Sequence, residues 1–202
     1  MASGNAGKLA EIRRLLWAGL GEAASALRLD GLAAVPGHLP PAEDGASYAD
    51  NALKKARAAC LPGAAVLAED SGLEVDALGG APGLRSARWA SGPDGSALDG
   101  AGLNRALLAR LGPSRARAAV MVAAVVVLLP DGTAFTGSGA VRGVLAEEPG
   151  GSGGFGYDAV FLLDDGRRLS LVPPEVKDEV SHRGQAVRAV LPQLRAWLER
   201  PA

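Results

Sequence analysis

The stretch from Arg115 to Glu147 constrains the fold of this chain more than any other part of it. It reads "RARAAVMVAAVVVLLP", then "DG", then "TAFTGSGAVRGVLAE". A Val-rich apolar run, a two-residue turn signal and a second strand-like run predict a long β-hairpin. The apolar run is too short to cross a bilayer as a helix, so we interpret it as a buried strand. The chain is therefore expected to contain a sheet that includes this hairpin.

Helical patterns occur on both sides of the hairpin. Ser47, with Asp50 three residues later, is typical of a helix N-cap, and Gly112-Pro113 predicts the end of another helix. Pro192 predicts a kink or a break in the last helix. The predicted helices cover 4–20, 47–61, 99–112 and 181–200, and further short strands are predicted at 64–70, 159–163 and 167–172.

Helices and strands are mixed along the chain without a linker or an internal repeat. This pattern favours an α/β fold with a mixed β-sheet and flanking helices, in a single domain over residues 1–202. A Gly-rich turn that feeds a helix is normally preceded by a strand, but only Met1 and Ala2 precede Ser3. We therefore expect either a first strand that is nearly absent or a start of the chain that is incomplete.

The composition is that of an ordinary globular protein. The 202 residues carry a net charge of −1 and are 48% hydrophobic, so nucleic acid and anionic membranes are not expected as the main partners. Lys8, Glu11, Arg13 and Arg14 interrupt any secretory signal, which predicts a cytoplasmic location. Cys60, as the single cysteine, excludes an internal disulfide and a cysteine-cluster metal site, and we predict that it is a small packed residue.

Two neighbouring carboxylates suggest chemistry. An apolar run ends in Glu69 and Asp70, directly before a Ser-Gly pair that predicts a turn. Such carboxylates are costly at the end of a buried strand unless they are paired or hold a cation. Upstream, Glu43 precedes a helix that carries Asn51 and Lys55. Together these residues predict a Mg²⁺ site completed by phosphate and water, although Glu43 alone is interpreted as a solvated loop residue.

The segment "SGNAGK", from Ser3 to Lys8, places small residues, an Asn and a Lys at the start of a helix. Free backbone N–H groups and the helix dipole favour anions there. The spacing does not fit a P-loop. Two interpretations stay open, a phosphate site and an ordinary N-cap.

A glycine loop, "GSGGFG" from Gly151 to Gly156, fits G-x-G-x-x-G only formally, because no strand precedes it and no helix follows it. Phe155, Tyr157 and Asp158 in this loop suit a flat ring with N–H groups; the alternative is a hairpin-like loop with packed aromatics.

A second polar cluster, "KDEVSHRG", starts at Lys177 and leads into the last helix. It brings Lys177, Ser181, His182 and Arg183 to the start of that helix. Basic groups at a helix N-terminus oppose the dipole, so the cluster favours an anionic or acceptor-rich ligand.

These motifs occur in one order: S-G-N-x-G-K, E-D-G-x-S-Y-x-D-N-A-x-x-K-A, E-D-S-G-L-x-V-D-A-L-G-G-x-P-G, S-A-R-W, G-G-F-G-Y-D and K-x-x-x-x-S-H-R-G. Each motif is weak alone, but the ordered set resembles the inosine triphosphate (dITP/XTP) pyrophosphatases from Ser3 to about Trp197. The resemblance implies an elongated mixed sheet with two lobes around a central cleft, usually in a homodimer. It also implies Mg²⁺-dependent hydrolysis of ITP, dITP and XTP to the monophosphate and pyrophosphate, which cleanses the nucleotide pool.

The resemblance also implies roles for individual residues. Asp70 is implied as the general base and as a metal ligand, with Glu43 and Glu69 as the other metal carboxylates. The implied substrate-binding residues are Ser3, Gly4, Asn5, Ala6, Gly7, Lys8, Asn51, Lys55, Ser71, Phe155, Gly156, Tyr157, Asp158, Lys177, His182 and Arg183. Donors such as His182 or Arg183 are expected to pair with the 6-oxygen of hypoxanthine or xanthine. Two alternatives stay open: a nucleotide pyrophosphatase of broader base specificity and a nucleotide-binding module without catalysis.

Overall fold

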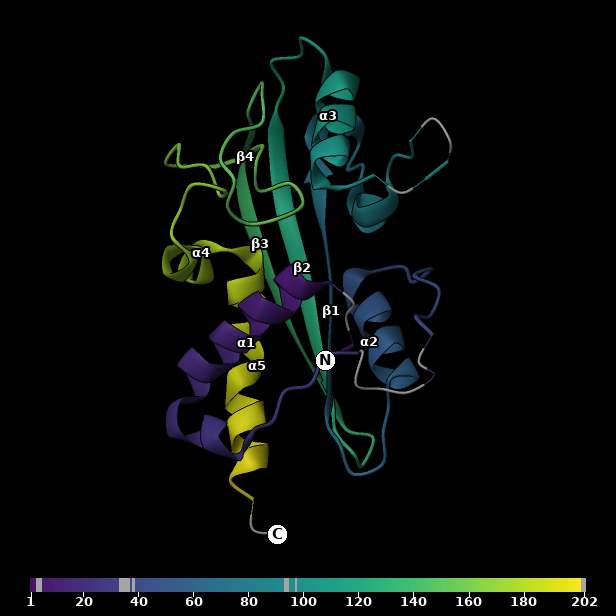
Figure 1. The fold of residues 1–202 in the computed structure, drawn as a ribbon, viewed down its shortest axis with the longest axis vertical. Helices are drawn as coiled ribbons and strands as arrows, with labels where there is room; N and C mark the ends of the chain where they lie inside the picture. Colours follow the sequence, from purple (N-terminus) through teal and green to yellow (C-terminus); the bar gives the residue numbers. More distant parts are fainter. Residues whose placement is uncertain (3–4, 33–36, 38, 93–94, 97, 201–202) are drawn as a thin grey trace. The chain divides into compact units, whose positions relative to one another are not determined.

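The long hairpin is present and forms the middle of the sheet (Figure 1). The computed structural model describes residues 1–2, 5–32, 37, 39–92, 95–96 and 98–200. Its strands are β1 (Val66–Val75), β2 (Ala118–Leu128), β3 (Ala134–Leu145) and β4 (Phe161–Leu163), in the sheet order β1-β2-β3-β4. β3 and β4 pair antiparallel, with Val144 opposite Leu162. The predicted hairpin between residues 115 and 147 is confirmed.

Five α-helices and three 3₁₀ segments accompany the sheet in the described part of the chain. They are α1 (Ala6–Leu20), η1 (Gly21–Ala26), α2 (Tyr48–Ala58), η3 (Asp76–Leu78), η4 (Gly83–Arg88), α3 (Gly100–Leu111), α4 (Pro174–Val180) and α5 (His182–Leu198). No helix among the described residues is both long and apolar enough to cross a bilayer.

The chain divides into two compact units. The first unit comprises Met1–Asp70, Ala123–Gly139 and Ser181–Ala202, and the second comprises Ser71–Val122 and Ala140–Val180. The boundaries fall inside β1, β2 and β3, so each of these strands contributes residues to both units. The predicted single domain with two lobes around a cleft stays a prediction.

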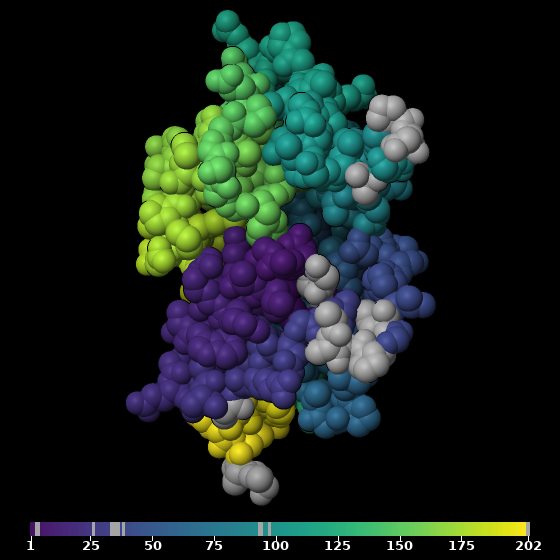
Figure 2. Space-filling model, viewed as in Figure 1, coloured from purple at the N-terminus to yellow at the C-terminus, as the bar shows by residue number. Residues whose placement is uncertain are grey.

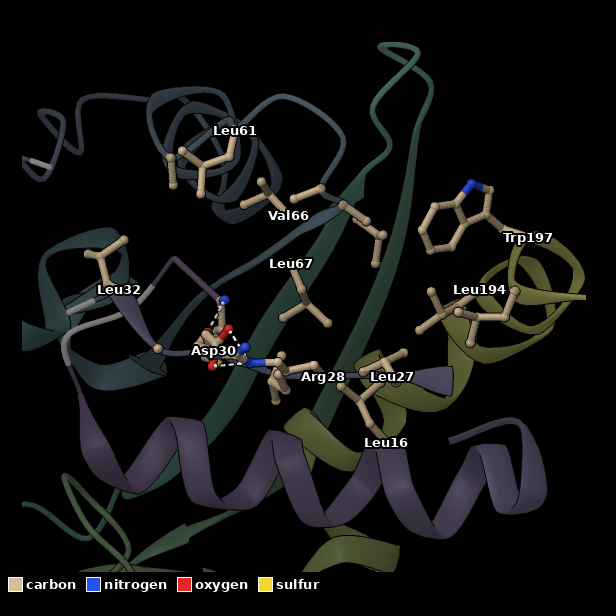
Figure 3. A pocket seen from close by; sticks show the side chains of 18 of the residues that line it. Leu16, Leu27, Arg28, Asp30, Leu32, Leu61, Val66, Leu67, Leu194 and Trp197 are labelled. Carbon is tan, nitrogen blue, oxygen red and sulfur yellow. Dashed lines mark hydrogen bonds and ion pairs between the residues drawn. The ribbon is translucent and has the colours of Figure 1, made fainter. Parts of the chain in front are cut away.

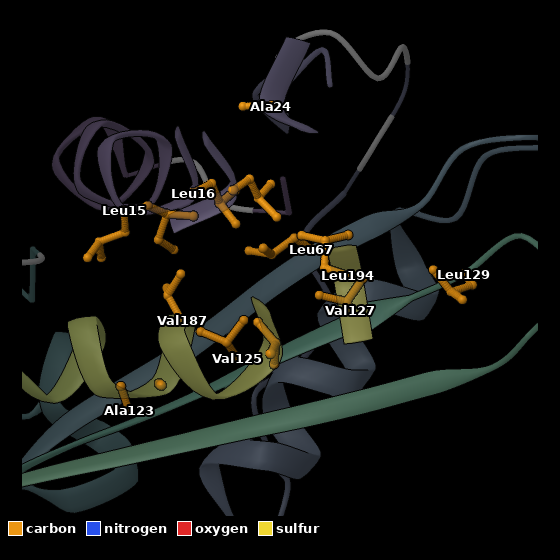
Figure 4. Close-up of a cluster of buried hydrophobic side chains, with 14 residues drawn as sticks. Leu15, Leu16, Ala24, Leu67, Ala123, Val125, Val127, Leu129, Val187 and Leu194 are labelled. Atoms are coloured by element: carbon orange, nitrogen blue, oxygen red, sulfur yellow. The ribbon is translucent and has the colours of Figure 1, made fainter. Parts of the chain in front are cut away.

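In the first unit, a hydrophobic core joins α1 and α5 to β1 and β2 (Figure 4). Leu16 of α1, Val187 and Leu194 of α5, Leu67 of β1 and Val127 of β2 belong to this core. Figure 2 shows that the atoms of α1, in purple, form part of the surface on the viewed face. The helix therefore buries only one side, as its apolar spacing predicts.

A second core of the first unit includes residues of α2. Ala52 and Ala56 of that helix cluster with Val66 of β1 and Val126 of β2. Because side chains alternate along a strand, Val126 packs into this core, whereas Val127 packs into the core around α1. Burial on both faces explains why β2 is an almost unbroken apolar run in the sequence.

The second unit has its own core around α3. Leu103 and Leu107 of this helix cluster with Leu73 of β1, with Phe161 of β4 and with Tyr157 from the glycine loop. Leu73, Leu107 and Phe161 have no exposed surface. This core supports the segment that carries the predicted ring-binding residues.

Two predicted helix starts are confirmed by their caps. The Ser47 side chain accepts a hydrogen bond from the N–H of Asp50 at 3.1 Å, and the Asp99 side chain accepts one from Gly102 at 2.7 Å. Before α1, Ala2 donates its N–H to the carbonyl oxygen of Leu67 at 2.8 Å, which links the short first segment to β1. Local cap chemistry was therefore readable from the sequence.

Two strand predictions were wrong. The Ser-Gly turn after Asp70 is absent, because β1 continues to Val75. Leu73 is buried there and donates its N–H to Ser86 Oγ at 2.8 Å, which holds the segment extended. The predicted strand 167–172 is reduced to a bridge between Leu162 and Arg168, because Ser170 N–H donates to the Asp158 carbonyl instead.

For Pro192 a kink or a break was predicted. The break is absent, since α5 runs to Leu198, and the kink stays a prediction. Buried Val190 and Leu194 on either side of the proline pack into the core, which offsets the lost backbone hydrogen bond. Cys60 is exposed rather than packed, because α2 ends at Ala58 before reaching it.

The close packing of β3 on α5 within the first unit gives a stability prediction. A Cβ at Gly139 would lie 2.1 Å from the His182 carbonyl oxygen and 2.6 Å from Gln185 Cβ. We expect Gly139→Ala to lower the free energy of unfolding by about 1–3 kcal/mol, measured by urea denaturation. Ser138→Ala is the matched control, because Ser138 is the exposed neighbour and its substitution should change stability by less than about 0.5 kcal/mol. Equal unfolding midpoints for the two variants would contradict the prediction.

Candidate active site

Glu69 and Asp70 are both buried in β1, with 1% and 5% of their surface exposed. Neighbouring residues of a strand point to opposite faces of the sheet. The two carboxylates accordingly have different partners, and each partner set carries positive charge.

Glu69 belongs to a buried ion-pair chain within the first unit. Its Oε2 lies 2.7 Å from Lys8 Nζ, and its Oε1 accepts hydrogen bonds from Arg183 Nε at 3.2 Å and Nη2 at 3.1 Å. Arg183 Nη1 lies 2.6 Å from Glu11 Oε2. The guanidinium thus joins two carboxylates, and Lys8 compensates the charge of the second oxygen of Glu69.

Asp70 is held by two donors from α2. Asn51 Nδ2 donates to its Oδ2 at 3.1 Å, and Lys55 Nζ lies 2.7 Å from its Oδ1. The same ammonium lies 2.5 Å from Glu43 Oε1. Burial acts to lower the pKa of Lys55, but the bonds and charges of Asp70 and Glu43 outweigh it and hold the pKa above its usual value. Asp70 is therefore fixed in orientation beside a permanent positive charge.

The "SGNAGK" segment is described from Asn5 onward, and Ser3 and Gly4 lie outside the described residues. Asn5 caps α1, because its Oδ1 accepts the N–H of Lys8 at 3.0 Å. Ala6 and Gly7 form the first turn of that helix. The N-cap interpretation is confirmed, and phosphate binding by this turn stays a prediction.

The predicted metal carboxylates supply oxygen donors in two places. Glu43 and Asp70 converge on one point, which Lys55 Nζ occupies, and Glu69 faces Lys8 and Arg183 instead. No group of three or more His, Cys, Asp or Glu side chains suited to a metal occurs among the described residues. Two convergent carboxylates fit a hard cation that takes most of its ligands from phosphate and water.

The predicted ring-binding loop lies in the second unit. Asp158 Oδ2 accepts the N–H of Phe155 at 2.7 Å and lies 2.6 Å from Lys177 Nζ. Lys177 Nζ also lies 5.0 Å from the centre of the Phe155 ring, a cation–π distance. Asp158 and Lys177 are buried, whereas Phe155 is half-buried. The carboxylate, the ammonium and the ring therefore form one local cluster.

Tyr157 has a structural environment. Its hydroxyl donates to the Ser86 carbonyl oxygen at 2.9 Å, and burial raises its pKa well above the usual value. Its ring belongs to the core around α3. For Tyr157, the packed-aromatic interpretation is confirmed.

Ser71, a predicted substrate-binding residue in the second unit, is half-buried.

His182 and Arg183 occupy the first turn of α5 in the first unit, and both are buried. Ser181 caps this helix by accepting the N–H of Gly184 at 3.1 Å.

Glu11, which pairs with Arg183, was not predicted from the sequence. No pattern in the sequence marks Glu11, because a single acidic residue in an amphipathic helix is ordinarily exposed to solvent.

A separate cavity of about 350 Å³ lies in the first unit (Figure 3). Its lining is mainly apolar and includes Leu16, Leu67 and Trp197, together with Arg28 and Asp30, which form an ion pair. None of the predicted site residues is among the described residues that line it. This cavity is therefore distinct from the predicted site residues.

Comparisons with known proteins agree with the motif pattern. The model of the Ham1 family matches residues 1–193. A dITP/XTP pyrophosphatase of Symbiobacterium thermophilum is 43% identical, with 98% of this chain and 95% of that protein covered. A dITP/XTP pyrophosphatase of Frankia alni is 44% identical, with 98% and 97% covered.

Solved structures share the fold. The Staphylococcus aureus Ham1 protein superposes with a TM-score of 0.77 at 30% identity, covering 98% of this chain and 96% of that one. A nucleoside-triphosphatase (dITP/XTP pyrophosphatase) from Mycobacterium abscessus gives a TM-score of 0.70 at 41% identity, covering 95% and 96%. The predicted α/β fold, a sheet with flanking helices, is confirmed, although the four described strands form an antiparallel sheet rather than the predicted mixed one.

Proposed function

The chain belongs to the Ham1 family, and from this premise we propose that it hydrolyses ITP, dITP and XTP to the monophosphate and pyrophosphate. The observation that carries the proposal is the buried carboxylate of Asp70, held by Asn51 and Lys55 and next to Glu43. A carboxylate fixed beside cationic groups suits an attack by water on a phosphorus atom.

Asp70 is the proposed general base. It orients the attacking water and accepts its proton, while Asn51 and Lys55 keep the carboxylate in one orientation. Lys8 and Lys55 are proposed to bind triphosphate oxygens together with the N-terminal turn of α1. To do so, each ammonium exchanges a carboxylate partner for a phosphate oxygen.

Glu43 and Asp70 are proposed to hold a divalent cation, which we propose is Mg²⁺. Glu69, the third predicted metal carboxylate, pairs with Lys8 and Arg183, so a role in holding the ion requires it to leave these partners. When bound, Mg²⁺ supplies charge neutralisation on the triphosphate. The carboxylate oxygens of this chain suit that ion, and the small number of converging carboxylates leaves positions for phosphate.

Recognition of the base is proposed for the loop with Phe155, Gly156 and Asp158, together with Lys177 and His182. Hypoxanthine and xanthine present an acceptor oxygen where adenine presents an amine. A buried donor left unpaired by adenine costs about 1–3 kcal/mol, roughly ten- to hundredfold in selectivity. Arg183, also predicted to read the base, already bonds two carboxylates, so this function requires it to exchange one of them.

We expect two lobes around a substrate cleft, a homodimer, a cytoplasmic location, and neither nucleic acid nor membrane as a partner. The purine nucleotide is the expected ligand. These expectations rest on the family and on the near-neutral composition of the chain.

The direct test is pyrophosphate release by the purified protein with Mg²⁺ across ITP, dITP, XTP, GTP, ATP and CTP. We expect turnover concentrated on the first three. Equal turnover of all six would replace the proposal with a pyrophosphatase of broad specificity. Tight ITP binding without any turnover would identify a nucleotide-binding module instead.

A further inference from the structure

One fully buried amide outside the predicted site touches the predicted base loop. Asn104 lies in α3 with 2% of its surface exposed, and its Nδ2 donates to the Gly156 carbonyl oxygen at 3.0 Å. The acceptor fixes the amide orientation, because the reversed amide would place two oxygens against each other. Asn104 and Gly156 are both in the second unit.

The start of α3 also lies close to the same glycine. A Cβ on Gly100 would lie 3.4 Å from both the nitrogen and the oxygen of Gly156. Gly156 itself has a φ of +60°, a conformation that glycine adopts without strain. The backbone of the loop therefore meets α3 at a specific point, and the Asn104 hydrogen bond fixes that point.

Gly156 lies directly between the half-buried Phe155 and the buried Tyr157. Phe155 N–H is bonded to Asp158, and Lys177 lies over the Phe155 ring. The Gly156 carbonyl therefore belongs to the same local cluster as the ring, the carboxylate and the ammonium. The Asn104 bond joins α3 to a loop 52 residues away in the sequence.

Asn104 is not explained by stability alone. Its Oδ1 has no hydrogen-bond partner among the described residues, although the atom is buried. A buried acceptor without a partner is destabilising, and an apolar side chain of similar size would avoid that cost. Buried polar atoms without a hydrogen-bond partner are expected mainly where function requires the side chain.

We propose that Asn104 is a positioning residue for recognition of the purine base. It holds the Gly156 carbonyl and thereby sets the placement of Phe155, Asp158 and Lys177. The inference rests on the proposed function, because it assigns this loop to the base of the nucleotide.

The test compares Asn104→Leu with the unchanged protein in steady-state kinetics with Mg²⁺. We expect the KM for ITP to rise about tenfold, while kcat stays within about twofold. The preference for ITP over ATP should fall about tenfold. Each tenfold change corresponds to about the free energy of one hydrogen bond. Inhibition by inorganic triphosphate with Mg²⁺ should not change, since this probe has no base. Leu194→Ala, in the separate core around α1 and α5, is the control: it should lower the melting temperature but leave KM and base preference unchanged.

Asn104→Ala is the second variant, because it removes the donor without adding a charge or the bulk of leucine. It should reproduce the same changes in KM and base preference if Asn104→Leu does not fold. An unchanged KM and base preference, or equal weakening of ITP and inorganic triphosphate, would overturn the inference. An unchanged protein that does not hydrolyse ITP would instead refute the proposed function.

Discussion

Asp70→Asn is expected to lower kcat for ITP by about 10²–10⁴-fold, the usual contribution of a general base. The amide has nearly the same shape, and its oxygen still accepts a hydrogen bond from Lys55, but it cannot take a proton from water. The measurement is pyrophosphate release at saturating ITP, together with equilibrium binding of ITP, which should persist.

Asp44→Asn is the matched control for this prediction. Asp44 also pairs with a lysine, at 2.6 Å from Lys54 Nζ, but 72% of its side chain is exposed. The same change of one charge should leave kcat within about twofold, because screened surface pairs contribute little. If Asp70→Asn retained kcat as well as Asp44→Asn does, Asp70 would not be the base.

Arg183→Met is expected to lower the free energy of unfolding by about 3–5 kcal/mol. The substitution removes the cation between Glu11 and Glu69 and leaves Glu11 buried without the guanidinium at 2.6 Å. A buried carboxylate that loses its cationic partner pays its desolvation cost without compensation. Urea denaturation at pH 7 measures the loss.

Arg28→Met provides the comparison on the surface. Arg28 pairs with Asp30 at 3.0 Å, but 87% of the Arg28 side chain is exposed. We expect a loss of about 0–1 kcal/mol there. A similar small loss for Arg183→Met would mean that the ion-pair chain around Glu69 does not stabilise the fold.

Much of the fold was predictable because its signals are local. The Val-rich run and the Asp131-Gly132 turn predicted the hairpin, and Ser47 and Asp99 predicted two helix starts. Cap side chains and two-residue turns act over three or four residues, so the sequence alone can display them. The order of the motifs also predicted the family.

The failures concern interactions between distant segments. The β1 strand continues past Ser71 because Leu73 is buried and bonds Ser86, and α5 continues through Pro192 because the core holds both sides of it. Glu11 and Arg183 pair although they are 172 positions apart, and the sequence around either residue does not predict the pair. Local propensity gives way to tertiary packing in each of these cases.

The ion pairs of the first unit have a consequence for the form in which substrate arrives. Lys8, Lys55 and Arg183 contribute three positive charges to these pairs, whereas Glu11, Glu43, Glu69 and Asp70 contribute four negative ones. The negative side chains of the cluster neutralise its positive ones, so it has no excess positive charge for a nucleotide triphosphate without a bound cation. It follows that a nucleotide whose charge is partly neutralised by a divalent cation suits this site better than the free tetra-anion. In the proposed site, selection of the substrate therefore begins with the balance of charge, before any contact with the base.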